Sequence, residues 1–125
     1  IRFCGPMTEN NRVEAFAEFD ILAVPSIGFE TGPFTVLEAY AAGIPVIGSN
    51  HSGIAERVTN GQSGVLLPPG EVIAWKEGLK QVVEQYRSNA WNWSIPAVRP
   101  SQVIAEEMSD LYMDAQIQTL DKELE

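Results

Sequence analysis

The sequence predicts an α/β fold built on a doubly wound parallel sheet. Short uncharged apolar runs alternate along the chain with stretches whose apolar residues have helical spacing. The apolar runs are continuous, which is typical of strands covered by helices on both faces. Their starts recur about every twenty residues, the length of one strand and its helix. Together these observations indicate a layered α/β domain.

The first half of the chain is predicted to contain three strands and two helices. Asn11, with Glu14 three residues later, resembles a capping box at a helix start. Pro33 suits the first position of a helix, where its missing N–H costs nothing, and Gly43 suits the C-terminal cap. We expect strands at residues 1–5, 21–24 and 44–47, and helices at residues 11–19 and 33–42.

The second half is predicted to add one strand and three helices. We expect a short helix at 54–58, a strand at 65–67, a helix at 71–87 and a loop at 88–100. Residues 1–118 are expected to form the domain, and residues 119–125 a frayed tail. A last helix is expected to begin near Ser101, with an apolar face of Ile104, Met108, Leu111, Tyr112 and Ala115.

Composition and charge limit the possible classes of function. The 125 residues suffice for one domain, and 45% hydrophobic with 20% charged residues suits a globular domain with a core. The net charge of −9 argues against binding to nucleic acid or to an anionic membrane surface. No stretch has the composition of a membrane span. The chain begins with Ile1 rather than methionine, and we expect it to be a piece of a longer protein.

Several conspicuous side chains are predicted to be structural. The lone Cys4 excludes an internal disulfide and is expected to be a buried, inert thiol rather than a nucleophile. His51 is expected to anchor a loop or lie at the surface rather than catalyse. Trp91 and Trp93 are expected to pack rather than bind a sugar, and Glu56 is either a structural cap or a residue at a pocket edge. No metal-ligand spacing is present.

Residues 25–46 carry the candidate site. They place Glu30 in the loop after a strand, and Glu38 in the following helix, about 7.5 Å along the axis from Pro33. Ligands of parallel α/β sheets bind outside the carboxyl ends of the strands, where this loop lies. The helix start at Gly32 and Pro33 offers free backbone N–H groups and the positive end of a helix dipole, which suit a phosphate.

The order of these groups along the chain predicts the chemistry of the ligand. Glu38 can accept hydrogen bonds from vicinal hydroxyls, such as those of a ribose, and Glu30 from the hydroxyls of a second group. The helix start between them can hold phosphate, and Thr35 could add a hydroxyl there. A sugar–diphosphate–ribose ligand requires this order of groups.

Glu30 and Glu38 have the spacing of the E-x7-E motif of retaining GT-B glycosyltransferases, especially family 4 (group 1) of bacterial and archaeal enzymes. Residues 38–46, EAYAAGIPV, are similar to that family's E-A-x-A-x-G-x-P-V run. Residues 52–56, SGIAE, resemble its G-G-x-x-E segment, with Ser52 in place of the first glycine. The resemblance covers about residues 1–115, with further similar segments at Pro25-Ser26, at residues 60–66, at Trp93-Ser94 and in the final helix.

The resemblance implies a role for each matching residue. Glu38 would bind the nucleotide ribose, and Glu30 would contact the donor sugar as the catalytic residue. Gly5, at the end of the first predicted strand, would lie near the base. Many members of the family have Phe-Gly where this chain has Gly32-Pro33, so the side-chain wall differs here. The backbone groups that would line the diphosphate belong to Gly32, Pro33, Phe34 and Thr35.

The resemblance also implies a fold and a reaction. The chain would be the C-terminal donor-binding domain of a GT-B fold, Rossmann-like and incomplete at its N-terminal side, with four strands where the family has about six. The full-length enzyme would transfer a hexose from a UDP- or GDP-sugar to an acceptor with retention, without a metal or other cofactor. It would serve polysaccharide or glycolipid biosynthesis in the cytoplasm or at the inner face of the membrane.

Basic residues are absent from the candidate site region, since no Lys or Arg lies between Arg12 and Arg57. A helix dipole contributes about 0.3–1 kcal/mol at an exposed site, too little to hold a doubly charged leaving group. The resemblance places an Arg, a Lys and the acceptor-binding N-terminal domain before Ile1. We therefore expect the isolated chain to bind donor weakly and to be inactive.

Two other functions remain open. One is a sugar-nucleotide epimerase or hydrolase of GT-B shape, although such proteins lack the full motif run quoted above. The other is a non-catalytic nucleotide-binding or assembly domain, in which an exposed sheet edge would favour self-association. The sequence does not identify the base, the sugar or the acceptor.

Overall fold

The structure is a computed structural model that describes the backbone of residues 2–123 and the side chains of residues 2–113. Strands alternate with helices along most of the chain. The elements are η1 (Glu9–Asn11), α1 (Arg12–Ala17), β1 (Leu22–Val24), α2 (Phe34–Ala41), β2 (Val46–Ser49), α3 (Ser52–Arg57), β3 (Gly64–Leu67), α4 (Val72–Arg87) and α5 (Ser101–Glu123).

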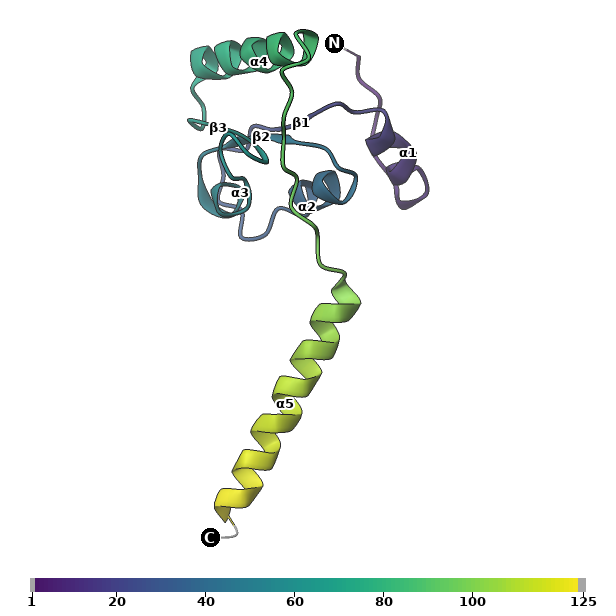
Figure 1. The fold of residues 1–125 in the computed structure, drawn as a ribbon, viewed down its shortest axis with the longest axis vertical. Helices are drawn as coiled ribbons and strands as arrows, with labels where there is room; N and C mark the ends of the chain where they lie inside the picture. The colour runs from purple at the N-terminus through teal and green to yellow at the C-terminus, as the bar shows by residue number, and fades with distance from the viewer. Residues whose placement is uncertain (1, 124–125) are drawn as a thin grey trace.

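The three strands of the described residues form a parallel sheet in the order β1-β2-β3. β2 is the central strand, with Val46 opposite Leu22 of β1 and Gly64 of β3. The helices α2 and α3 cover one face of the sheet and α4 covers the other (Figure 1). The predicted α/β class, with a doubly wound parallel sheet, is therefore confirmed.

The strand predicted at residues 1–5 is not formed by residues 2–5, which the structure describes as irregular chain. Phe3 is 94% exposed, and Cys4 is exposed as well. A strand is stable only when its N–H and C=O groups pair with a neighbour, and residues 2–5 pair with none of the three strands. The predictions of a fourth strand and of a buried Cys4 were therefore wrong.

The first helix begins differently from the prediction. The side-chain oxygen of Asn11 accepts a hydrogen bond from the Thr8 N–H at 2.7 Å, which closes the turn η1. Asn11 gives no side-chain cap to α1. The predicted capping box of Asn11 and Glu14 was wrong because the Asn11 oxygen is engaged in the preceding turn.

The helix α2 has a well-defined end at Gly43. The Gly43 N–H donates to the Tyr40 carbonyl at 2.9 Å, and the Ile44 N–H donates to the Ala39 carbonyl at 2.8 Å, which is the Schellman pattern. Gly43 has a φ of +74°, which glycine adopts without a Cβ clash. The predicted cap is confirmed, whereas Pro33 is the N-terminal cap rather than the first helical residue.

The core lies between the sheet and the helices α2 and α3. All four residues of β2 are buried, as expected for a strand with neighbours on both edges and helices on both faces. Burying one Val or Ile side chain contributes about 1.5–3 kcal/mol. The buried cluster consists of Phe16, Val24, Val36, Ala39, Tyr40, Ile44, Val46, Ile54 and Val58.

A buried polar contact joins α2 to the turn before β3. The Tyr40 hydroxyl and the Ser63 hydroxyl are 2.7 Å apart, and the Ser63 oxygen accepts a hydrogen bond from the Thr59 N–H at 3.0 Å. Burial raises the pKa of the Tyr40 hydroxyl, and the hydrogen bond with Ser63 offsets part of that rise. Burial therefore favours the neutral phenol in the folded state, and the hydrogen bond with Ser63 opposes this only in part.

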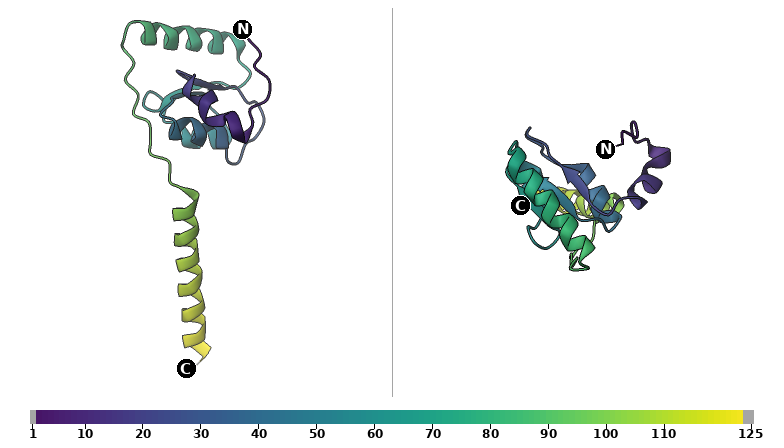
Figure 2. Two further views of the ribbon diagram at one scale, coloured as in Figure 1. Left: turned by 90° about the vertical axis from the view of Figure 1, so that its right-hand side faces the viewer. Right: turned by 90° about the horizontal axis from the view of Figure 1, so that it is seen from above.

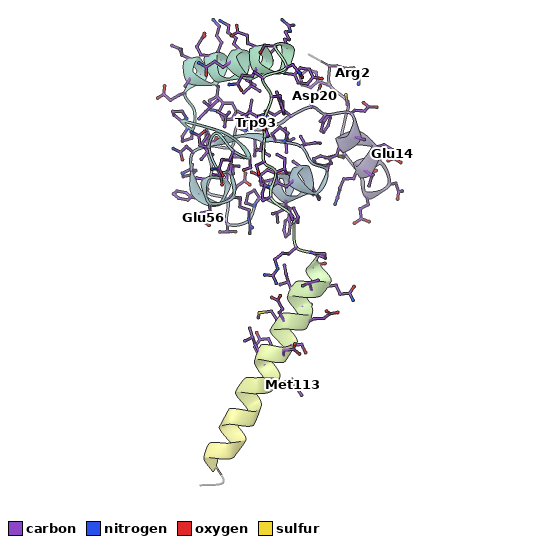
Figure 3. All side chains as sticks on the ribbon, in the orientation of Figure 1. Arg2, Glu14, Asp20, Glu56, Trp93 and Met113 are labelled. Atoms are coloured by element: carbon purple, nitrogen blue, oxygen red, sulfur yellow. The ribbon has the colours of Figure 1, made fainter. Side chains whose placement is uncertain are left out.

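The segment between α4 and α5 packs back along the domain. The rings of Tyr86, Trp91 and Trp93 meet edge to face, with successive centroids 5.2 and 5.6 Å apart. Ile95 and Val98 pack against the core. Figure 3 shows Trp93 lying against the α/β domain. The predicted packing role of the two tryptophans is confirmed.

The helix α5 projects away from the α/β domain, as Figures 1 and 2 show. Of its predicted apolar face, Ile104, Met108, Leu111 and Tyr112 are exposed, and Ala115 lies beyond the described side chains. The helix continues to Glu123, through most of the predicted tail, and residues 124–125 lie outside the described residues. No helix within the described residues is long and apolar enough to cross a bilayer.

Close approach of β3 to β2 requires glycine at position 64. A Cβ added to Gly64 would lie 1.9 Å from the carbonyl oxygen of Val46, whereas a Cβ added to Gly28 would meet open space. We expect Gly64→Ala to lower the free energy of unfolding by about 3 kcal/mol or more, because the two strands must separate. In the same denaturant titration, the control Gly28→Ala should change it by less than about 0.5 kcal/mol. Equal effects would contradict this constraint.

The raised pKa of Tyr40 predicts a loss of stability in alkali. The contribution of neutral Tyr40 to the free energy of unfolding is complete below pH 10.0, the ordinary pKa of tyrosine. It is lost as the pH rises above that value, because Tyr40 ionises at a lower pH in the unfolded chain than in the folded one. We expect Tyr40→Phe to flatten the alkaline decline in the free energy of unfolding, measured by denaturation at a series of pH values. In the half-exposed Tyr86 a hydrogen bond to Asp20 raises the pKa, but solvent screens this pair, so the control Tyr86→Phe should flatten the decline less. If the free energy of unfolding of wild type and of Tyr40→Phe declined identically in alkali, Tyr40 would not be the source of the decline.

Candidate functional site

Glu30 lies in one of the segments at the carboxyl edge of the sheet. The segments that follow β1, β2 and β3 there are residues 25–33, 50–51 and 68–71. The first is the longest, and it carries Glu30 to the start of α3. In parallel α/β sheets this edge is where ligands bind.

The main chain of Glu30 is held by the start of α3. The Glu30 N–H donates to the Ser52 hydroxyl oxygen at 3.1 Å, and the Gly53 N–H donates to the Glu30 carbonyl at 2.8 Å. The Ser26 hydroxyl forms a hydrogen bond to Oε1 of Glu30. Both the backbone and the carboxylate of Glu30 are thereby fixed without a ligand.

Gly53 permits the close contact between this loop and α3. An added Cβ would lie 2.5 Å from the Glu30 carbonyl oxygen and 3.1 Å from Cδ of Pro33. The glycine is needed because the loop backbone occupies the space of a side chain. The contact thus links the loop of Glu30 and the start of α2 to the start of α3.

His51 lies against the same loop. Its ring stacks at a tilt on Phe29, with centroids 4.4 Å apart, which agrees with the predicted loop-anchoring role. Its Nε2 atom and the hydroxyl of the fully buried Ser49 are buried and have no hydrogen-bond partner among the described residues. The end of β2 therefore holds two polar atoms whose hydrogen-bonding capacity is unused.

The start of α2 presents free backbone donors. The first N–H groups of a helix have no partner within it, and Pro33 supplies no side-chain cap. Gly32, Phe34 and Thr35 are exposed while Pro33 is buried. The helix start thus combines a fixed backbone, exposed neighbours and the positive end of the dipole, and the anion site expected there stays a prediction.

Glu38 is paired with a residue that the sequence analysis placed outside the site. Nη1 of Arg12 in α1 lies 2.8 Å from Oε1 of Glu38, with the two side chains 44% and 28% exposed. A groove of about 250 Å³ lies beside the pair, lined also by Val13, Phe16 and Ala42. No sequence signal connects the partners, which are 26 positions apart.

The remaining site residues are less closely connected. Glu30 and Glu38 share no hydrogen-bond partner in the described residues, since one contacts Ser26, Ser52 and Gly53 and the other contacts Arg12. Gly5 is exposed, with a φ of +78°. It does not end a strand, because residues 2–5 are irregular. Among the described residues, no group of three His, Cys, Asp or Glu side chains could hold a metal ion.

A parallel sheet with helices on both faces defines a Rossmann-like α/β domain. Residues 1–93 match the profile of the family described as "Glycosyl transferases group 1". The chain belongs to this family of glycosyltransferases.

Relatives and solved structures agree with this assignment. The chain is 31% identical over 84 residues to a D-inositol 3-phosphate glycosyltransferase of Corynebacterium diphtheriae, covering 67% of this chain and 19% of that one. It is 29% identical over 119 residues to a glycogen synthase of Mycobacterium tuberculosis, covering 91% and 28%. The chain thus spans under a third of the length of these relatives.

Two solved structures share the fold. Anabaena Alr3699/HepE in complex with UDP has a TM-score of 0.55 and 27% identity, covering 58% of this chain and 20% of that one. Sucrose-phosphate synthase from Thermosynechococcus elongatus has a TM-score of 0.78 and 23% identity, covering 94% and 30%. The first was solved with bound UDP, and the second, at 23% identity, supports the fold alone.

The Arg12–Glu38 pair should contribute little to stability despite its short distance. Both side chains are partly exposed, and such pairs are worth about 0.2–1 kcal/mol. A double-mutant cycle with Arg12→Met and Glu38→Gln, read by denaturant titration, should give a coupling energy in this range that shrinks at high salt. A coupling well above this range would mean that the pair is structural rather than available to a ligand.

Proposed function

We propose that the chain is the donor-binding domain of a retaining glycosyltransferase of family 4, which uses a nucleotide-diphosphate sugar. The observation that carries the proposal is the fixed Glu30 loop beside the open start of α2, with Glu38 one turn further along that helix. Membership of the group 1 glycosyltransferases supports it.

The diphosphate would bind at the start of α2. The free N–H groups of Phe34 and Thr35 would donate to its oxygens, and the Thr35 hydroxyl would add a further donor. Gly32 would allow the close approach of a phosphate to the backbone. The start of α2 is already held in place by the packing of Gly53 of α3 against Pro33.

Glu38 would bind the ribose of the nucleotide. Oε1 is paired with Arg12, which leaves Oε2 to accept hydrogen bonds from the vicinal ribose hydroxyls. Arg12 would thereby orient the carboxylate, and it brings one positive charge to a region that has no other Lys or Arg between residues 12 and 57. Gly5 would lie near the base.

Glu30 would contact the donor sugar as the catalytic residue. Sugar transfer would proceed with retention and without a metal ion or other cofactor. The dipole of α2 contributes about 0.3–1 kcal/mol and one partly exposed arginine adds little, so the leaving diphosphate needs further basic groups. We expect those groups and the acceptor site in other parts of the full-length enzyme, and no turnover by this chain alone.

The donor would be a UDP-sugar or a GDP-sugar, and UDP is the nucleotide bound by the Anabaena neighbour. The full-length protein would act in polysaccharide or glycolipid synthesis, in the cytoplasm or at the inner face of the membrane. An assembly role is a second candidate. It is favoured by the outer edge of β1, which pairs with no strand in the described residues, and by an apolar groove of about 680 Å³ beside it that Ala23, Pro25 and Trp75 help to line.

Calorimetric titration with UDP, GDP and ADP tests the donor site. We expect saturable binding of one of the three nucleotides, weakened about tenfold or more in Glu38→Gln, because the amide removes a charged acceptor for the ribose hydroxyls. The matched control Glu84→Gln changes an exposed carboxylate on α4 and should bind as wild type does.

Two contrary results are informative. Equal binding by wild type and Glu38→Gln would remove Glu38 from the site. No binding of any nucleotide, together with concentration-dependent self-association in analytical ultracentrifugation, would favour the assembly role instead.

A further inference from the structure

Ser52 has a backbone conformation that serine rarely adopts. Its φ is +47°, in the left-handed region that favours glycine, and the other such non-glycine residue among those described is Asn89, with a φ of 55°. Asparagine tolerates this region better than serine does. The residue therefore keeps an unfavourable conformation at the start of α3, in the segment next to the candidate site.

The side chain of Ser52 forms a hydrogen bond that glycine at this position could not form. Its hydroxyl oxygen accepts the hydrogen bond from the Glu30 N–H at 3.1 Å. The neighbouring Gly53 N–H donates to the Glu30 carbonyl at 2.8 Å. Consecutive residues at the start of α3 thus hold both backbone groups of Glu30, and only the bond to Ser52 depends on a side chain.

These contacts fix the direction of the Glu30 side chain. The peptide groups around Glu30 cannot rotate without breaking a bond to Ser52 or Gly53. The carboxylate is held separately by the Ser26 hydroxyl. The Glu38 side chain forms no hydrogen bond with these residues, and its carboxylate pairs with Arg12 in α1. The hydrogen bonds from the start of α3 therefore reach Glu30 and not the Glu38 side chain.

We propose that Ser52 is a positioning residue for Glu30, and that through Glu30 it determines recognition of the sugar part of the donor but not of the nucleotide part. This inference rests on the proposed function, in which Glu30 contacts the sugar and Glu38 the ribose. The unfavourable conformation of Ser52 is retained because its hydroxyl orients a ligand-binding loop.

Two variants separate positioning from stability. Ser52→Ala and Ser52→Gly both remove the hydroxyl, but glycine relieves the left-handed conformation and alanine does not. Ser52→Gly should therefore melt at a higher temperature than Ser52→Ala. Both variants should nevertheless release the Glu30 N–H to the same extent, because both lack the hydroxyl. If Ser52 had only a structural role, the effect on Glu30 would instead follow the loss of stability and be larger in Ser52→Ala.

Amide hydrogen exchange followed by NMR tests the contact without any ligand. The Glu30 N–H should exchange about tenfold or more faster in both Ser52 variants than in wild type, while the Gly53 N–H keeps its protection. The control Asn89→Gly relaxes the same backbone conformation at the end of α4 and should leave Glu30 unchanged. Unchanged exchange at Glu30 in Ser52→Gly would overturn the proposal.

Calorimetric binding of UDP and UDP-glucose, and of GDP and GDP-mannose, tests the consequence. In both Ser52 variants the affinity for the sugar nucleotide should fall about two- to tenfold relative to that for the free nucleotide, as expected for one misplaced hydrogen-bonding group. Free-nucleotide affinity should match wild type. Equal losses for both ligands, or no loss for either, would overturn the proposal.

The two proposals fail in different ways. If wild type binds none of these ligands, the proposed donor function is wrong, and so is the role of Ser52 in sugar recognition. The exchange experiment then still decides whether Ser52 positions Glu30. If wild type binds these ligands and the Ser52 variants bind them with the same affinities, the donor function stands and only the Ser52 proposal falls.

Discussion

The structure depends on the pairing of β2 with a parallel strand on each edge. This pairing buries all four residues of β2 and brings the carboxyl ends of three strands to one edge of the sheet. The loop of Glu30 and the start of α3 then meet closely enough that position 53 has no room for a side chain. The strand register therefore determines where the Glu30 loop and the start of α3 lie, and the polar contacts between them fix the local geometry.

The sequence predicts those parts of the fold that local physics determines. The apolar runs at 21–24, 44–47 and 65–67 each overlap an observed strand, at 22–24, 46–49 and 64–67, because they are long enough only for buried strands and lie between helical segments. Gly43 ends α2 because its φ is positive there. The run at 1–5 was predicted from the same kind of local pattern, yet its described residues 2–5 form no strand, because a local pattern does not determine whether a segment pairs with a sheet edge.

The site is predictable to a similar extent. The positions of Glu30 and of the α2 start follow from the strand, loop and helix order, which the sequence indicates directly. The Arg12–Glu38 contact joins residues 26 positions apart. Serine itself gives no signal of the left-handed conformation at position 52, which is suggested only by the glycine at this place in the similar G-G-x-x-E segment. Asn11 illustrates the same limit at short range, because its side chain had two possible partners and the structure uses Thr8.

The close contact between the Glu30 loop and α3 has a consequence for the thermodynamics of recognition. The N–H, the carbonyl and the carboxylate of Glu30 all form hydrogen bonds within the protein. The loop around Glu30 has therefore already lost much of the conformational entropy that a mobile loop would lose on binding. A ligand at this edge would meet groups in their final arrangement, so its affinity would reflect its own contacts rather than the ordering of the protein. Such a rigid edge favours discrimination among ligands of similar size, because it cannot adjust to one whose groups are displaced.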